Sequence, residues 1–226
     1  MATTLNAEAA APTFGRESRY GLDNHGIRNP GTVFWNLNPV ELVEHAIRRG
    51  EGKLVDGGPF NAVTSPHTGR SPQDRFVVRE PSSENDIDWG KVNIPFDAEN
   101  YDRLREDVMG HLEGQNLYVR DMWAGADPRY RLGVRVITPN AWHNLFAYNM
   151  FRRPAAREMD DFQPGFTILH APEYQADPAR HGTRTSTFIL IHFGRREVLI
   201  GGTRYAGEIK KSVFGLLNYL YPRQGI

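Results

Sequence analysis

The chain has 226 residues, of which 39% are apolar and 24% charged, as is ordinary for a globular protein with at least one well-buried domain. Lysine plus arginine equals aspartate plus glutamate, with 27 of each, so no net charge recruits nucleic acid or a membrane surface. The absence of cysteine excludes disulfides, thiolate zinc sites and cysteine nucleophiles, and it is compatible with a cytoplasmic location. No run approaches the ~20 apolar residues of a membrane helix, and no secretory signal is expected, because the first residues lack a basic region followed by an apolar core.

The chain is predicted to begin with an arm and then to form short strands around a helix. Residues 1–28 have weak apolar periodicity and are expected to be a mobile amino-terminal arm, with one helical turn near 18–24. A strand is predicted over 32–36. A helix follows, because Asn38 suits the N-cap, Pro39 the first helical position and Glu41 the acidic position of a capping box. The residues expected on its buried face are Val40, Val43, Ala46 and Ile47.

The middle of the chain is predicted to alternate between strands and amphipathic helices. The strand candidates are 53–55, 62–64, 75–79, 117–123 and 132–138. Asp97 is predicted to cap a helix that ends near residue 113. The residues expected on the inward face of that helix are Tyr101, Leu104, Val108 and Leu112. Asn140 is predicted to cap the next helix, whose inward residues are expected to be Trp142, Leu145, Phe146 and Met150.

The last third is predicted to contain a strand at 166–170, a hairpin of 185–193 with 197–201, and a helix over 208–221. Intermixed helices, strands and hairpins indicate an α/β fold of mixed α+β character, with a mixed sheet rather than a regular doubly wound one. No linker divides residues 29–226, so they are expected to form a single domain.

One candidate site is the stretch 201–214, Gly-Gly-Thr-Arg-Tyr-Ala-Gly-Glu-Ile-Lys-Lys-Ser-Val-Phe, which joins a buried strand to a helix. Lys210 and Lys211 lie in the first turn of that helix, where the dipole disfavours each cation by roughly 0.3–1 kcal/mol. Lysines at such a position suggest a site for an anion. The same electrostatics favour a neutral Lys211, the form that a metal ligand or proton carrier requires. Spacing alone leaves open the alternative that both lysines are solvated.

A second candidate site is the loop 64–75, which holds Arg70 in a Gly-Arg-Ser-Pro turn. A rigid arginine suits a two-point grip on a carboxylate or phosphate. Spacing alone favours the alternative, an exposed arginine paired with Asp74. His143 and His170 are interpreted as core or surface histidines rather than ligands, because the sequence has no complete metal-binding motif.

Three segments carry a resemblance to a known family. The first is 201–214, and the second is His-Thr-Gly-Arg-Ser-Pro-Gln-Asp-Arg-Phe at 67–76. The third is Arg-Val-Ile-Thr at 135–138, with Ala-Trp-His-Asn-Leu-Phe at 141–146 and Asn-Met-Phe at 149–151. In this order they resemble ATP-dependent phosphoenolpyruvate carboxykinase, and the resemblance covers residues 32–226, the N-terminal domain only. It implies a fold like the N-terminal domain of phosphoenolpyruvate carboxykinase.

The resemblance implies roles for four residues of this chain. Arg70 and Tyr205 would bind the carboxylate of oxaloacetate, the substrate. Lys211 would help to ligate Mn²⁺ or Mg²⁺ as a neutral amine, in an incomplete metal site, and would border the ATP site. Lys210 would offset charge near the phosphates, so Lys210 and Lys211 are the candidate catalytic residues. The chain departs from the family pattern at Gln73, Arg75 and Arg204.

The resemblance also implies the activity of a complete enzyme, the gluconeogenic conversion of oxaloacetate and ATP to phosphoenolpyruvate, CO₂ and ADP. This chain has no Gly-x-x-x-x-Gly-Lys-[Ser/Thr] phosphate loop. It is therefore expected to pack against a C-terminal nucleotide-binding domain, to bind neither ATP nor metal tightly by itself, and to be inactive alone. No nucleic-acid or membrane partner is expected. The alternative is a stand-alone, non-catalytic domain that binds dicarboxylates or other anions, or a partner protein.

Overall fold

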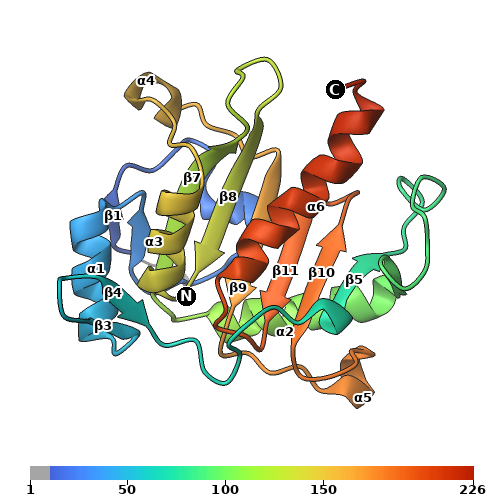
Figure 1. The fold of residues 1–226 in the computed structure, drawn as a ribbon, viewed down its shortest axis with the longest axis horizontal. Helices are drawn as coiled ribbons and strands as arrows, with labels where there is room; N and C mark the ends of the chain where they lie inside the picture. Colours follow the sequence, from blue (N-terminus) through green and yellow to red (C-terminus); the bar gives the residue numbers. More distant parts are fainter. Residues whose placement is uncertain (1–10) are drawn as a thin grey trace, which may run out of the picture.

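The computed structural model describes residues 11–226 and centres on one large mixed sheet (Figure 1). The strands of that sheet are β1 (Thr13–Gly15), β2 (Val33–Trp35), β5 (Arg75–Val78), β6 (Ile94–Phe96), β7 (Leu117–Ala124), β8 (Leu132–Thr138), β9 (Phe166–Ala171), β10 (Phe188–His192) and β11 (Glu197–Gly201). Within the described residues they pair in the order β1-β2-β7-β8-β9-β11-β10-β5-β6. Neighbours run parallel except β7 with β8 and β10 with β11. A separate hairpin pairs β3 (Gly52–Leu54) with β4 (Phe60–Ala62).

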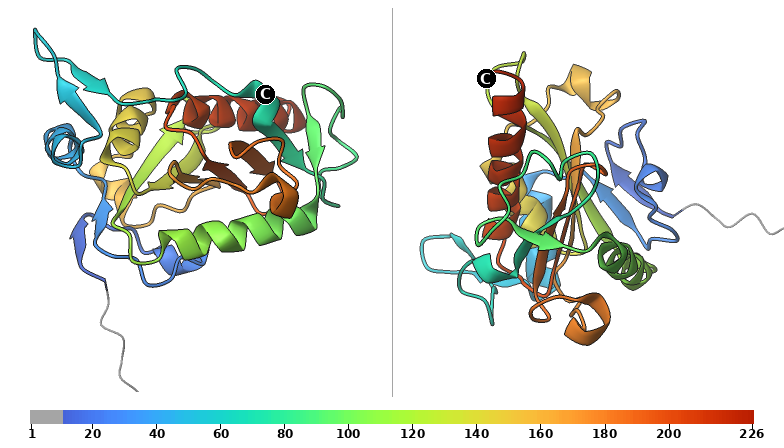
Figure 2. Two further views of the ribbon diagram at one scale, coloured as in Figure 1. Left: turned by 90° about the horizontal axis from the view of Figure 1, so that it is seen from below. Right: turned by 90° about the vertical axis from the view of Figure 1, so that its right-hand side faces the viewer.

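Helices cover both faces of the large sheet. They are α1 (Pro39–Arg48), α2 (Ala98–Leu112), α3 (Ala141–Met150), α4 (Ala156–Met159), α5 (Pro178–His181) and α6 (Gly207–Arg223), with 3-10 turns η1 (Leu22–His25) and η2 (Pro72–Asp74). Figure 2 shows α2 on one side of the sheet and α6 on the other. The mixed α/β fold predicted from the sequence is confirmed. Among residues 11–226, no helix is both long and apolar enough to cross a membrane.

The core forms on both faces because side chains alternate along each strand. Val198 and Ile200 of β11 pack with α6, whereas Leu199 between them packs with α2. A strand covered on both faces reads as a continuous apolar run, as β10 and β11 do. The inward residues predicted for α2 are all fully buried: Tyr101, Leu104, Val108 and Leu112.

Two helices differ in detail from their sequence-based prediction. In α1 the capping box of Asn38 and Glu41 is confirmed, but Val40 is 76% exposed and Ile47 41% exposed, while Leu42 is fully buried. The predicted α1 face is confirmed for Ala46, which is fully buried, and for Val43, which packs against the core, but it is wrong for Val40 and Ile47. The reason is that α1 packs mainly on α3 rather than on the sheet, which turns the stripe of Leu42 and Ala46 inward.

Helix α3 begins directly after Asn140, as predicted, but its capping bond differs from the prediction. Asn140 makes no side-chain cap; the carboxylate of Glu51 accepts instead from the amides of Ala141 (3.2 Å) and Trp142 (2.7 Å). Tertiary contact thus supplies the acceptor that helix amides require. Met150 is 39% exposed rather than inward, and His143 is among the residues that take the buried face.

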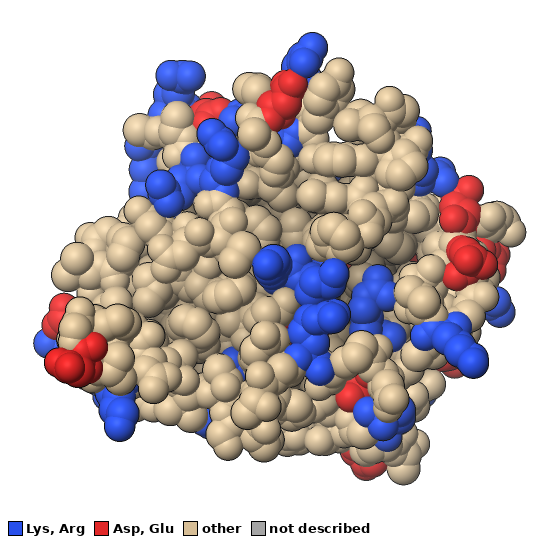
Figure 3. Space-filling view, in the orientation of Figure 1, with Lys and Arg blue, Asp and Glu red and all other residues tan. Residues whose placement is uncertain are grey.

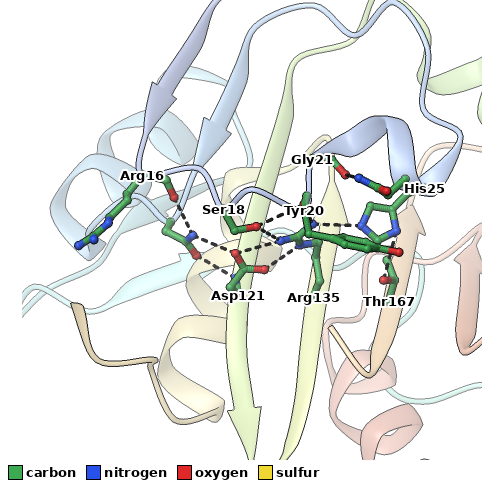
Figure 4. A network of polar contacts seen from close by, with 10 residues as sticks. Arg16, Ser18, Tyr20, Gly21, His25, Asp121, Arg135 and Thr167 are labelled. Carbon is green, nitrogen blue, oxygen red and sulfur yellow. Dashed lines mark hydrogen bonds and ion pairs between the residues drawn. The ribbon is translucent and has the colours of Figure 1, made fainter. Parts of the chain in front are cut away.

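The amino-terminal segment packs against the sheet over its described part. Residues 1–10 of the expected arm lie outside the described residues, but 11–28 contribute β1 and η1, and Leu22 and Ile27 are buried. The cause is a polar network that local sequence patterns do not reveal (Figure 4). Arg135 of β8 donates to Asp121 of β7 at 2.7 Å, and both side chains are 0% exposed.

The same guanidinium holds the segment itself. Arg135 donates to the Ser18 hydroxyl at 2.6 Å, to the carbonyl of Tyr20, and to Nε2 of His25 at 3.1 Å. Burial and the nearby positive charge of Arg135 lower the pKa of His25 to about 3, which keeps its imidazole neutral as an acceptor.

Candidate functional site

The strand register brings the two candidate site segments together at one end of the inner strands, where β11 ends and β5 begins. Gly201 at the end of β11 pairs with Phe188 at the start of β10, and the next residue of β10, Ile189, pairs with Arg75 at the start of β5. The chain therefore enters β5 where it leaves β11. The loop before β5 carries Arg70, and the turn after β11 leads into α6, so segments more than 100 residues apart become neighbours.

A buried carboxylate fixes these segments to each other. Glu208, in the first turn of α6 and 3% exposed, accepts a hydrogen bond of 2.6 Å from the amide of Ser71. Burial raises the pKa of Glu208, while the Ser71 amide and the positive charges of Arg70 and Arg75 act in the opposite direction. Glu208 thus fixes the backbone next to Arg70 relative to the start of α6.

Glycines of the turn permit close packing within the chain. A Cβ on Gly207 would lie 2.4 Å from Cε1 of Tyr205, so the tyrosine ring lies directly against the start of α6. A Cβ on Gly201 would lie 2.3 Å from the Phe188 ring. The amide of Tyr205 donates to the Thr203 hydroxyl at 3.1 Å. These glycines are required by the protein's own side chains.

A pocket of about 570 Å³ lies beside α6 and is bordered by Arg70, Arg75, Lys91 and Lys211. Figure 3 shows lysine and arginine side chains gathered in the middle of this face, over the start of α6. Arg75 lies partly inside: its guanidinium donates to the carbonyl of Val92 at 3.1 Å, and burial lowers its pKa. Several cations at one pocket suit a small ligand with more than one negative charge.

Aromatic side chains also line the pocket. Phe193 and Tyr219 stack with ring centroids 3.9 Å apart, and both line the pocket. Nζ of Lys211 lies 4.0 Å from the centroid of the half-exposed Phe214 ring, close enough for a cation–π contact. Asp86 also reaches the pocket but is paired with Arg223 at 2.5 Å.

The structure brings together some of the predicted site residues. Arg70 and Lys211 line the same pocket, while Lys210 is exposed and Tyr205 is half-buried, and neither of these is among its lining residues. The alternative pairing of Arg70 with Asp74 is not observed: Asp74 pairs with Arg184 at 2.9 Å.

Sequence reasoning gave no site role to Arg75, Lys91 or Glu208. Arg75 had an available signal, its place where the resembled family carries lysine. Lys91 had none, because it follows a polar connection whose course depends on tertiary packing. His143 and His170 are fully buried, in agreement with their interpretation as core histidines.

The described residues do not make a metal site. Among residues 11–226, no group of three or more His, Asp or Glu side chains could hold a metal ion. Lys211 offers one nitrogen, whereas Mn²⁺ and Mg²⁺ require several oxygen ligands. A divalent cation therefore does not fit this set of donors by itself.

Comparison with known proteins identifies the family. A sequence model of phosphoenolpyruvate carboxykinase matches residues 31–226. The chain belongs to the phosphoenolpyruvate carboxykinase family. It is 53% identical over 209 residues to phosphoenolpyruvate carboxykinase (ATP) of Thermus thermophilus. The matched region covers 91% of this chain and 40% of that relative.

Other members of the carboxykinase family match in the same way. The protein of the same name in Cereibacter sphaeroides is 50% identical over 205 residues, covering 91% of this chain and 38% of the relative. The one in Moorella thermoacetica is 46% identical over 207 residues, with 92% and 39% coverage. The resemblance inferred from three motifs is confirmed, and the alternative of a stand-alone, non-catalytic domain that binds anions or a partner protein is not favoured. The chain spans about 40% of the length of these curated relatives.

Proposed function

We propose that this chain is the substrate-side, N-terminal part of an ATP-dependent phosphoenolpyruvate carboxykinase, and that its pocket binds the carboxylates of oxaloacetate. The observation that supports this most directly is the hydrogen bond between Glu208 and Ser71, which couples the Arg70 loop to the helix start that carries Lys211. The overall reaction proposed is the conversion of oxaloacetate and ATP to phosphoenolpyruvate, CO₂ and ADP.

The proposed roles follow from the chemistry of each side chain. The planar guanidinium of Arg70 grips one carboxylate through two parallel hydrogen bonds. Tyr205, which is not among the lining residues of the pocket, would contact the same carboxylate from the turn before α6. Lys211, at the pocket, would offer one nitrogen to the metal ion as a neutral amine, and Lys210 offsets charge where phosphates would lie. Arg75 adds a partly buried cation at the far side of the Arg70 loop.

ATP and a divalent metal ion belong to the proposed reaction rather than to this chain alone. Since phosphoryl transfer depends on positioning and charge neutralisation around the phosphates, it needs donors that this chain lacks, including a phosphate loop. We propose that these come from a C-terminal nucleotide-binding domain packed against the chain, in the cytoplasm.

The experiment that tests the proposal is calorimetric titration of the protein with oxalate, a stable dicarboxylate analogue of the enolate. Arg70→Lys replaces a two-point grip by a point charge and should weaken binding by about 1–3 kcal/mol. The melting temperature should not change, since the exposed Arg70 contributes nothing to the core.

Arg195→Lys is the matched control. Arg195 is also an exposed arginine; it pairs with Asp102 of α2 and is not among the residues that line the pocket. Oxalate affinity should survive this change. Equal affinities of the Arg70 and Arg195 variants would remove Arg70 from the site and refute the proposal.

A further inference from the structure

The turn between β11 and α6 is held through its carbonyl groups. Gly202 accepts from the Thr187 hydroxyl at 3.0 Å, Thr203 accepts from His170 Nε2 at 2.9 Å, and Arg204 accepts from His143 Nε2 at 2.9 Å. Three consecutive carbonyls thus receive one side-chain donor each. Gly202 and Thr203 are buried, so their carbonyls need donors from the protein rather than from bulk water.

The donors come from separate elements. His143 lies in the first turn of α3 and His170 in β9, and Thr187 directly precedes β10. The two imidazoles are 0% exposed and contact each other, with ring centroids 4.3 Å apart at an interplanar angle of 64°. Neither ring lines the pocket.

The hydrogen bonds define the state of both rings. A carbonyl oxygen only accepts, so Nε2 must carry the proton in His143 and in His170. Nδ1 of each ring has no hydrogen-bond partner among the described residues. Burial lowers the pKa of His170 to about 4 and lowers that of His143 as well, where the neighbouring His170 adds to the effect. Both rings are therefore neutral donors of a single hydrogen bond.

We infer that His143 and His170 are positioning residues, which hold the backbone of Gly202–Arg204 and thereby aim Tyr205 and the first turn of α6. The next residue after the held carbonyls is Tyr205, and Glu208, Lys210 and Lys211 follow within the first turns. The effect on ligand binding rests on the proposed function, whereas the effect on the turn does not.

The test compares His170→Leu, which removes the donor, with His170→Gln, whose side-chain amide can donate from a similar position, and repeats the pair at His143. Amide hydrogen exchange is measured for residues 203–208 relative to α2, whose amides report global stability. We expect His170→Leu to accelerate exchange at 203–208 by about fivefold relative to α2, as for loss of one hydrogen bond. His170→Gln should restore most of the protection.

His192→Leu is the matched control. His192 is also buried, but it lies at the opposite end of β10, where it pairs with Glu197. This change should leave relative exchange at 203–208 unaltered. Nitrogen-15 spectra of the unsubstituted protein should show a protonated Nε2 and an unprotonated Nδ1 in both buried rings.

Two results would overturn the inference: a proton on Nδ1 of either ring, or Leu and Gln variants with the same relative exchange at 203–208. Oxalate titration of the same variants adds the functional readout, with about fivefold weaker binding expected for His170→Leu and recovery in His170→Gln. If the unsubstituted protein does not bind oxalate, the proposed function fails, while the exchange and tautomer measurements still decide the positioning role.

Discussion

Replacing Asp121 by Asn removes the negative charge opposite a fully buried arginine without changing the size of the side chain. Arg135 would keep its hydrogen bonds to the Ser18 hydroxyl and the Tyr20 carbonyl but would lose its counter-ion. The two charged groups now lie 2.7 Å apart and have no exposed side-chain surface. The variant therefore leaves one uncompensated charge in the core.

The loss can be bounded from this geometry. Removing one partner of a buried ion pair costs about 3–5 kcal/mol of unfolding free energy, against a total of about 5–15 kcal/mol for a typical domain. With an m-value of about 2 kcal/mol per molar, the midpoint of urea unfolding should fall by about 1.5–2.5 M. Oxalate affinity of the folded variant should not change, because the network holds the amino-terminal segment and does not border the pocket.

Two further variants make the result decisive. Asp160→Asn removes the ion-pair partner of Arg16; the side chain of Asp160 is 52% exposed and that of Arg16 is 46% exposed. Because this pair is exposed, the change should leave the free energy of unfolding nearly unchanged. The double variant Asp121→Leu with Arg135→Met buries no charge and should be less destabilised than Asp121→Leu alone; the two single variants complete the double-mutant cycle. If Asp121→Asn is no more destabilising than Asp160→Asn, the buried pair does not hold the segment in place.

Three other predictions concern acidity, capping and turnover. The lowered pKa values of His25 and His170, about 3 and about 4, mean that the unfolded chain binds protons first as pH falls below 6.5. The free energy of unfolding should thus drop between pH 7 and pH 5, by about 2 kcal/mol per histidine at pH 5. Urea titrations that give the same free energy of unfolding across this pH range would contradict the prediction. Glu51→Ala should lower the free energy of unfolding by about 0.5–2 kcal/mol, because it removes the acceptor that caps α3. A thermal unfolding curve equal to that of the unsubstituted protein would contradict this. The purified chain with ATP, Mn²⁺ and oxaloacetate should form no phosphoenolpyruvate in a coupled assay, and turnover above a Lys211→Ala control would overturn that reasoning.

Local sequence determined the elements whose signals lie within a few residues of one another. The stripe of α2 is an example: its predicted inward residues are fully buried, because a period of 3.6 already defines one face. The capping box of Asn38 and Glu41 is another, since both partners lie in one helical turn. The motifs around Arg70 and Lys211 were specific enough to indicate the family before any coordinates.

Tertiary structure decided everything that depends on partners distant in the sequence. Glu51 displaces Asn140 as the cap of α3, and Arg135 turns residues 11–28 from an expected arm into a packed segment. The meeting of Arg70 with Lys211 follows from strand register across β11, β10 and β5. Such contacts arise because buried polar groups must find partners wherever the fold brings them, and local periodicity carries no record of which partners those are.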